Sequence, residues 1–132
     1  MLARATLILV FAYHGIVPKL WLRDAGEQAM LRAGGVPEGR VHQALIAMGM
    51  AELAWAFVLL AFGSRAWPYL MTIVGMFAAL VMVGIQSPAY LGQAFNPVTL
   101  NLGVASLAGI AWMHANNLPS ARRCLRRKPK ES

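Results

Sequence analysis

The chain has 132 residues, enough for one domain, and its composition excludes an ordinary water-soluble fold. Hydrophobic residues make up 58% and charged residues only 13%, whereas a soluble domain carries roughly 25% charged residues, so this chain has too little charge to cover a surface in water. The net charge of +7 does not indicate nucleic-acid binding, because six of the twelve lysines and arginines cluster between Arg122 and Lys130, behind the last apolar run.

Four apolar runs, each close to the roughly 20 residues that cross a bilayer as a helix, predict a multi-pass membrane protein. We expect helices at about 4–22, 41–62, 67–86 and 97–114. The predicted fold is all-α: an integral membrane four-helix bundle of residues 1–118, with a short interfacial helix between the first two helices. Residues 119–132 are predicted to form a basic, disordered cytoplasmic tail.

The first apolar run contains a histidine, a proline and a lysine, in the stretch FAYHGIVPKLW of residues 11–21. After it, Asp24 and Glu27 have the spacing of a helix N-cap followed by the third helical residue, and Gly34 with Gly35 marks the end of that short helix. A helix lying on the membrane surface fits this segment, and a loop is the simpler alternative.

The later helices carry packing and capping signals. Gly75 and Ala79 lie on one face of the third helix, where small residues allow another helix to approach closely. The uncharged segment 87–97 is expected to lie at the interface or to fold back over the bundle. Asn96 before Pro97 predicts the N-cap and first residue of the fourth helix.

The loop charges predict the orientation. With four crossings both termini share a side, which holds eight basic residues (Arg4, Arg65 and the six of the tail) against four on the other side. The positive-inside rule therefore predicts cytoplasmic termini in a bacterial inner membrane.

The polar residues of the apolar runs fall in the outer half of the bundle. A helical rise of about 1.5 Å per residue places His14 about 12 Å and Glu52 about 16 Å below the outer ends of their helices. Because an ionisable group inside a membrane needs a partner, we expect His14 and Glu52 to pair. The candidate residues for ligand binding or proton relay are His14, Lys19, Glu52, Gln86, Asn96 and Asn101.

Each candidate also has a purely structural interpretation. The His14–Glu52 pair can be a structural hydrogen bond, or it can be functional, as buried ionisable groups in membranes tend to be. Snorkelling to the interface is the favoured role of Lys19, and helix capping that of Asn96. No catalytic residue and no metal site is predicted, because His14 and Glu52 have no third strong ligand at their level.

Three segments together resemble the DoxX-like membrane proteins: YHGIVPKL at 13–20, GMAELAWAFVLL at 49–60 and FNPVTLN at 95–101. The resemblance implies a four-helix bundle and points to His14, Pro18, Lys19, Glu52, Asn96, Pro97 and Asn101. In that family pattern a lysine usually precedes the last asparagine, and Leu100 stands there in this chain. Better-known relatives belong to membrane oxidoreductase systems, including a thiosulfate:quinone oxidoreductase.

Three functions remain open from the sequence, and none establishes an enzymatic activity. The first is an accessory subunit of a membrane redox system, whose outer-half pocket holds a quinone or another small amphiphile while a membrane or cytoplasmic partner supplies the electron carrier. The second is a structural or assembly subunit, and the third a small proton-coupled carrier that uses Glu52. The expected partners are the lipid bilayer, a redox protein and further copies of the chain, and not nucleic acid. No cofactor is encoded in the sequence, and a quinone is the one cofactor expected to bind.

Overall fold

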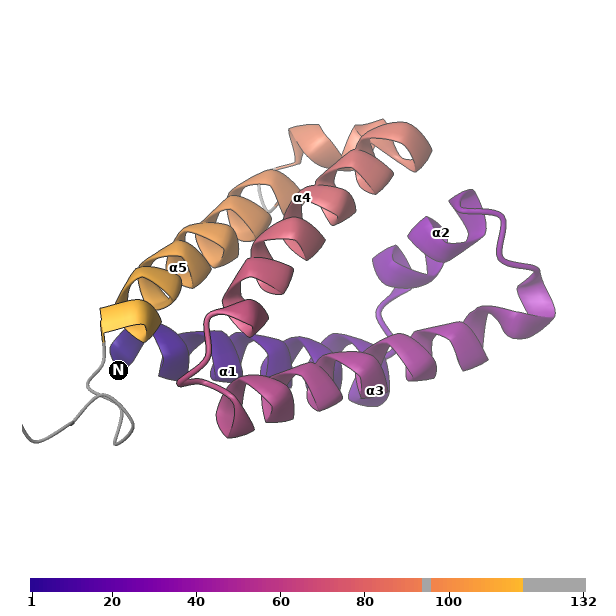
Figure 1. The fold of residues 1–132 in the computed structure, drawn as a ribbon. Coiled ribbons are helices and arrows are strands. Elements are labelled where there is room, and N and C mark those ends of the chain that lie inside the picture. The colour runs from indigo at the N-terminus through magenta and orange to yellow at the C-terminus, as the bar shows by residue number, and fades with distance from the viewer. Residues whose placement is uncertain (94–95, 118–132) are drawn as a thin grey trace, which may run out of the picture.

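A computed structural model describes residues 1–93 and 96–117, and these fold into helices without a strand (Figure 1). The predicted tail, 119–132, lies outside the described residues. The elements in chain order are α1 (Leu2–His14), the π-helix η1 (Gly15–Trp21), α2 (Ala25–Ala33), α3 (Glu38–Ala61), α4 (Trp67–Gln86), the 3₁₀-helix η2 (Pro88–Gly92) and α5 (Pro97–Asn117).

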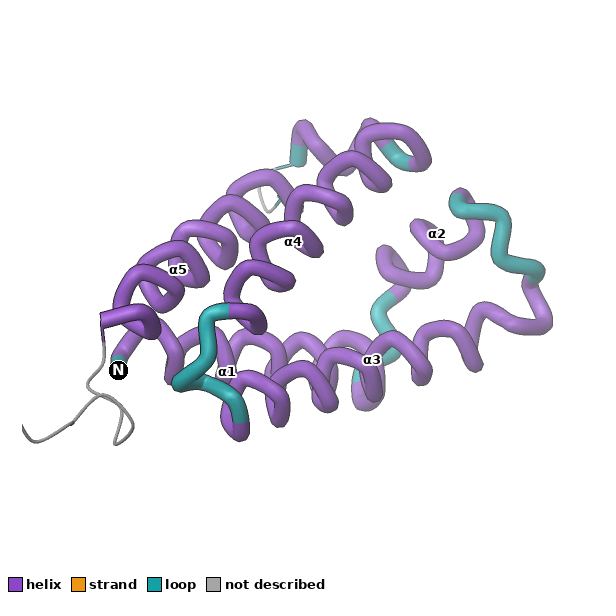
Figure 2. The backbone as a smooth tube through the Cα atoms, in the orientation of Figure 1, coloured by secondary structure: helices purple, strands orange, loops and turns teal. Residues whose placement is uncertain are grey.

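The long helices form two pairs that diverge like the sides of a wedge. The continuous helix of α1 and η1 packs along α3, and α4 packs along α5, while α1 against α5 joins the pairs. Helices α3 and α4 are connected by a short turn but separate beyond it, as Figure 2 shows in the same view as Figure 1. The N-terminus and the described end of α5 lie together at the closed end of this wedge (Figure 1).

The closed end is filled by an apolar core drawn from all four long helices. These side chains are at most 9% exposed, so this end of the bundle is sealed. The core residues are Leu7, Phe11, Ala56, Leu59, Tyr69, Val104, Ala108 and Ala111.

Polar contacts fasten the turn between α3 and α4 onto this core. The Arg4 guanidinium donates to the carbonyl oxygens of Leu59 (3.2 Å) and Leu60, which stabilises the last turn of α3, where carbonyls lack helical partners. The Tyr69 hydroxyl donates to the Gly63 carbonyl at 2.7 Å. A side chain at Gly63 would displace the Arg4 guanidinium from this position.

The first and third helices cross at a pair of glycines. A Cβ added to Gly15 would lie 2.7 Å from the Gly49 carbonyl oxygen, and one added to Gly49 would lie 2.9 Å from the Gly15 carbonyl oxygen. The close approach predicted at Gly75 is wrong, because a Cβ there would meet nothing within 4 Å. Gly15 and Gly49 therefore allow the first and third helices to approach closely.

Helix α2 turns sharply away from the first helix and lies across the open end of the wedge (Figure 1). The bend between Leu2–Trp21 and Ala25–Ala33 is 88°. The Asp24 side chain accepts from the Glu27 N–H at 3.0 Å, which confirms the predicted N-cap, and the helix ends before Gly34. None of its residues is buried, so α2 covers the bundle without entering its core.

The outer surface of the long helices is suited to lipid. Among the described residues, three segments have the length and apolarity to cross a membrane: Glu38–Ala61, Trp67–Gln86 and Pro97–Ala115. The first helix passes the same test together with α2, as a bent pair, which gives up to four spans. Large apolar side chains such as Phe57 (67% exposed) and Ile85 (75% exposed) point outward, and a continuous apolar surface of this kind requires lipid around it. The prediction of an all-α membrane bundle is confirmed.

Candidate functional site

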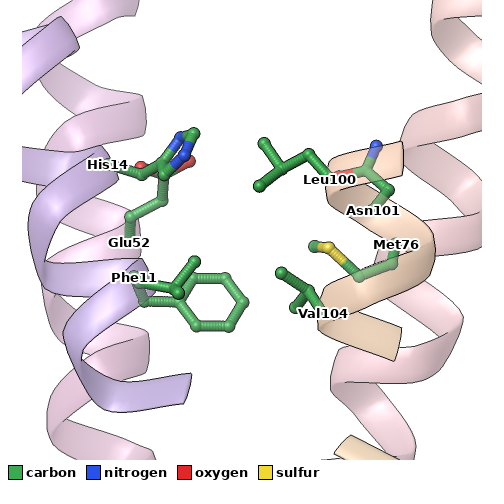
Figure 3. Close-up of a pocket in the computed structure, with 8 residues that line it drawn as sticks. Phe11, His14, Glu52, Met76, Leu100, Asn101 and Val104 are labelled. Carbon is green, nitrogen blue, oxygen red and sulfur yellow. The ribbon is translucent and has the colours of Figure 1, made fainter. Parts of the chain in front are cut away.

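A cavity of about 1090 Å³ lies between the two helix pairs, at the end of the bundle that α2 covers. It extends toward the sealed core as a smaller pocket of about 60 Å³, whose walls are drawn in Figure 3. Most of the walls are apolar, with polar side chains converging on them from every element. The polar lining residues are His14, Lys19, Asp24, Glu27, Glu52, Gln86, Tyr90, Gln93, Asn96, Thr99 and Asn101.

A buried lysine between two carboxylates forms the charged centre of this cavity. The Lys19 Nζ lies 3.0 Å from Glu52 Oε1 and 2.9 Å from Glu27 Oε1, and the Lys19 side chain is only 3% exposed. The second oxygen of Glu52, Oε2, is buried and has no hydrogen-bond partner among the described residues. One cation therefore pairs with two acids, and one buried carboxylate oxygen beside the cavity lacks a hydrogen-bond partner among the described residues.

The π-helix η1 explains how Lys19 reaches this position. Pro18 lacks the N–H that an α-helix interior requires, and the wider π-turn from Gly15 to Trp21 accommodates it. In an α-helix of 3.6 residues per turn, residues five apart point about 140° away from each other. The i→i+5 bonding of a π-helix brings such residues closer to one face, so Lys19 lines the same cavity as His14.

Two expectations about these charges are corrected by the geometry. The ion-pair partner of Glu52 is Lys19 and not His14, because no hydrogen bond or ion pair joins His14 to Glu52 among the described residues. Lys19 does not snorkel to the interface, because its ammonium is buried between Glu27 and Glu52. His14 lies at the level of Glu52, as expected, beside it on the same wall of the small pocket, and faces Leu100 and Asn101 (Figure 3).

The other predicted residues also line the cavity. The Asn96 Oδ1 accepts from the Thr99 N–H at 3.0 Å, which confirms Asn96 as a helix cap. Asn101 is 9% exposed and lies beside Leu100 in the small pocket (Figure 3). A Cβ added to Gly34 would lie 2.8 Å from Gln86 Oε1. The end of α4 therefore lies close to the end of α2. All six predicted residues therefore surround one cavity, and their role in ligand binding or proton relay stays a prediction.

Glu27 and Tyr90 are cavity residues that the sequence did not single out. The capping pattern assigns Glu27 to the first turn of α2. Only the backbone N–H of Glu27 binds Asp24, so its carboxylate can form the ion pair with Lys19. The Tyr90 hydroxyl donates to the Gly26 carbonyl at 3.4 Å, linking η2 to α2. Only the 88° bend before α2 brings Glu27 and Gly26 over the cavity, and the local sequence does not reveal the direction of that bend.

The residues that line the cavity lie within a segment that matches a known protein family. The model of the DoxX-like family matches residues 8–109. The chain belongs to the DoxX-like family. The matched segment of this DoxX-like protein includes every residue that lines the cavity, from Val10 to Val104. No curated protein and no solved structure matches the chain.

Proposed function

We propose that this DoxX-like protein binds a small quinone-like amphiphile in the cavity, as an accessory subunit of a membrane redox system. The observation that carries the proposal is the unpartnered Oε2 of Glu52, buried at the polar centre of a cavity with mainly apolar walls. Ligand sites typically combine apolar walls with a few convergent polar groups, and a buried polar atom without a partner is costly unless a ligand or water meets it.

The chemistry of a quinone head group fits this centre. Ionised Glu52 accepts a hydrogen bond from a quinol hydroxyl, and protonated Glu52 donates one to a quinone carbonyl. The Lys19 ammonium lies 3.0 Å from Glu52 Oε1, and Glu52 is the group proposed to exchange a proton with the ligand as the ligand changes state. His14, beside Glu52 on the same wall of the small pocket (Figure 3), is the second group proposed to exchange a proton with the ligand.

The electrons come from a partner protein in this proposal. Reduction of a quinone to a quinol takes two electrons and two protons. Glu52 and His14 transfer the protons, while a flavin, haem or metal centre of the partner transfers the electrons. The chain is therefore assigned the binding and protonation of the ligand, in a complex that carries out the electron transfer.

The sealed end of the bundle argues against a carrier. A carrier must open its site alternately to both sides, but the core around Leu7, Leu59 and Tyr69 closes the cavity toward the termini. A purely structural role of the Lys19–Glu52 pair does not use the free Glu52 Oε2 or the cavity around it.

The test is the binding of a decyl-substituted benzoquinone to the purified protein in lipid nanodiscs. Glu52→Leu removes the free carboxylate oxygen while Lys19 keeps Glu27, so the variant is expected to fold and to bind about 10–100-fold more weakly, the loss of a hydrogen bond to a charged group. Glu38→Leu, on the same helix but outside the cavity, is the matched control and should bind like the wild type. Equal affinities for all three proteins would contradict the proposal.

We also propose that the cavity faces the outer side of a bacterial inner membrane, with both termini cytoplasmic. The support is the eight-to-four division of basic residues between the two sides. A cysteine placed at Gly35, at the α2 end, should react with an impermeant thiol reagent in intact cells, in a Cys124→Ser background. A cysteine placed at Ser64, in the opposite turn, should not react, and the reverse pattern would overturn the orientation.

A further inference from the structure

We infer that the ligand has a flexible apolar chain, and that this chain passes between α3 and α4 so that the ligand enters the cavity sideways from the bilayer. This inference rests on the proposed function and adds the class of ligand and its route. The α3–α4 opening is defined by Met48 on α3 and by Met76, Ala79 and Met82 on α4, all of which line the large cavity.

Helices α3 and α4 are held together only near their connecting turn. The Trp55 indole N–H donates to the Thr72 hydroxyl at 3.0 Å, and this is the last side-chain hydrogen bond between the two helices among the described residues. Beyond this bond toward α2, the helices diverge (Figure 1). Because α3 and α4 both have the length and apolarity to span the membrane, the space between them faces lipid chains and not water.

Methionines on both sides of the opening suit a mobile hydrocarbon chain. Met48 is 40% exposed and Met82 is 51% exposed, so both lie at the boundary between the cavity and the outer surface. Met30 of α2 adds a further methionine to the wall. Unbranched methionine side chains adapt to ligands of varied shape, whereas branched side chains would impose a fixed shape.

The polar end of the cavity is covered by α2. Helix α2 lies across it, attached through the Lys19–Glu27 ion pair and the Tyr90–Gly26 hydrogen bond. Glu52 lies one helical turn from Met48 on α3, so a head group at Glu52 places its chain at the opening. An amphiphile with a hydrogen-bonding head and an apolar tail matches this order of polar and apolar walls.

The experiment compares two ligands with the same head group, a decyl-substituted benzoquinone and its methyl-substituted analogue, in nanodiscs, with each concentration expressed per lipid. Met82→Trp narrows the opening from α4, and Met48→Trp narrows it from α3. Leu100→Trp is the matched control on α5, in the small pocket beside the proposed head-group site, where it should affect both ligands alike. Each tryptophan replaces a side chain that is at least 40% exposed, so all three variants are expected to fold.

The α3–α4 variants should weaken binding of the decyl compound about tenfold, as an overfilled site does, and change binding of the methyl compound by less than about twofold. Leu100→Trp should not discriminate between the two ligands. If both ligands bind the wild type in a Glu52-dependent manner but Met82→Trp and Met48→Trp affect them equally, the route is wrong and the proposed function stands. Discrimination by Leu100→Trp alone would also overturn the route. If neither ligand binds the wild type, the proposed function itself fails.

Discussion

Replacing Lys19 with methionine should destabilise the protein strongly, because one substitution removes the counter-ion of two acids. Coulomb's law at an effective dielectric constant of about 20 gives roughly 5.5 kcal/mol of attraction for unit charges at the 3.0 Å that separate Lys19 Nζ from Glu52 Oε1. Desolvation offsets part of this attraction, and removal of one partner of a buried ion pair typically costs about 3–5 kcal/mol. We expect Lys19→Met to lower the free energy of unfolding by an amount in that range.

Glu52→Gln should cost less than Lys19→Met, because Lys19 keeps Glu27 at 2.9 Å. The double variant Lys19→Met/Glu52→Gln should be more stable than the sum of the two single effects implies, by about 1 kcal/mol or more. The assay is denaturant-induced unfolding in a mild detergent, followed by helical circular dichroism. The matched control is the exposed Arg32–Glu38 pair, whose single and double variants should show additive, small effects. Additive effects for Lys19 and Glu52 would show that their charges do not interact and would refute this site.

Further predictions concern packing, capping and the role of His14. Gly49→Ala should lower the free energy of unfolding by about 1–3 kcal/mol, because its Cβ would lie 2.9 Å from the Gly15 carbonyl oxygen. Gly103→Ala is the control, and it should be neutral or stabilising because a Cβ there meets open space. Equal effects of the two substitutions would contradict the close contact between Gly15 and Gly49. Asn96→Ala should cost about 1 kcal/mol in the same unfolding assay through loss of the cap on α5, and an unchanged stability would exclude the cap. His14→Phe should leave stability nearly unchanged but weaken quinone binding, because it removes the imidazole that lines the small pocket, and an unchanged affinity would exclude His14 from the binding site.

The ends of the helices could be predicted from the sequence where proline fixes the backbone. Helix α4 begins at Trp67 and ends at Gln86, as predicted, because Pro68 is tolerated in a first turn and Pro88 forces Ser87 out of the helical conformation (φ −149°). The Asp24 cap was predictable for a similar reason, since its side chain needs only the N–H of Glu27, three residues away. Such local rules cover most of the fold of this protein.

The partners of the charged residues could not be predicted in the same way. A residue five positions after His14 points elsewhere in an α-helix, and only the π-turn brings Lys19 into the cavity beside it. The third member of the cluster, Glu27, is placed beside Lys19 by the 88° bend between two helices. Depth along the helices correctly grouped His14 and Glu52, but depth does not reveal which side chains meet, because that depends on helix rotation.

The most direct test of the central claim is the infrared difference spectrum of the protein in nanodiscs with and without a decyl-substituted benzoquinone. The account predicts a ligand-induced change in a carboxyl band that is present in the wild type and in Glu38→Gln but absent in Glu52→Gln, because the free Glu52 Oε2 meets the quinone head group. Binding of the ligand with a carboxyl spectrum that is unchanged, or changed alike in Glu52→Gln, would contradict the account.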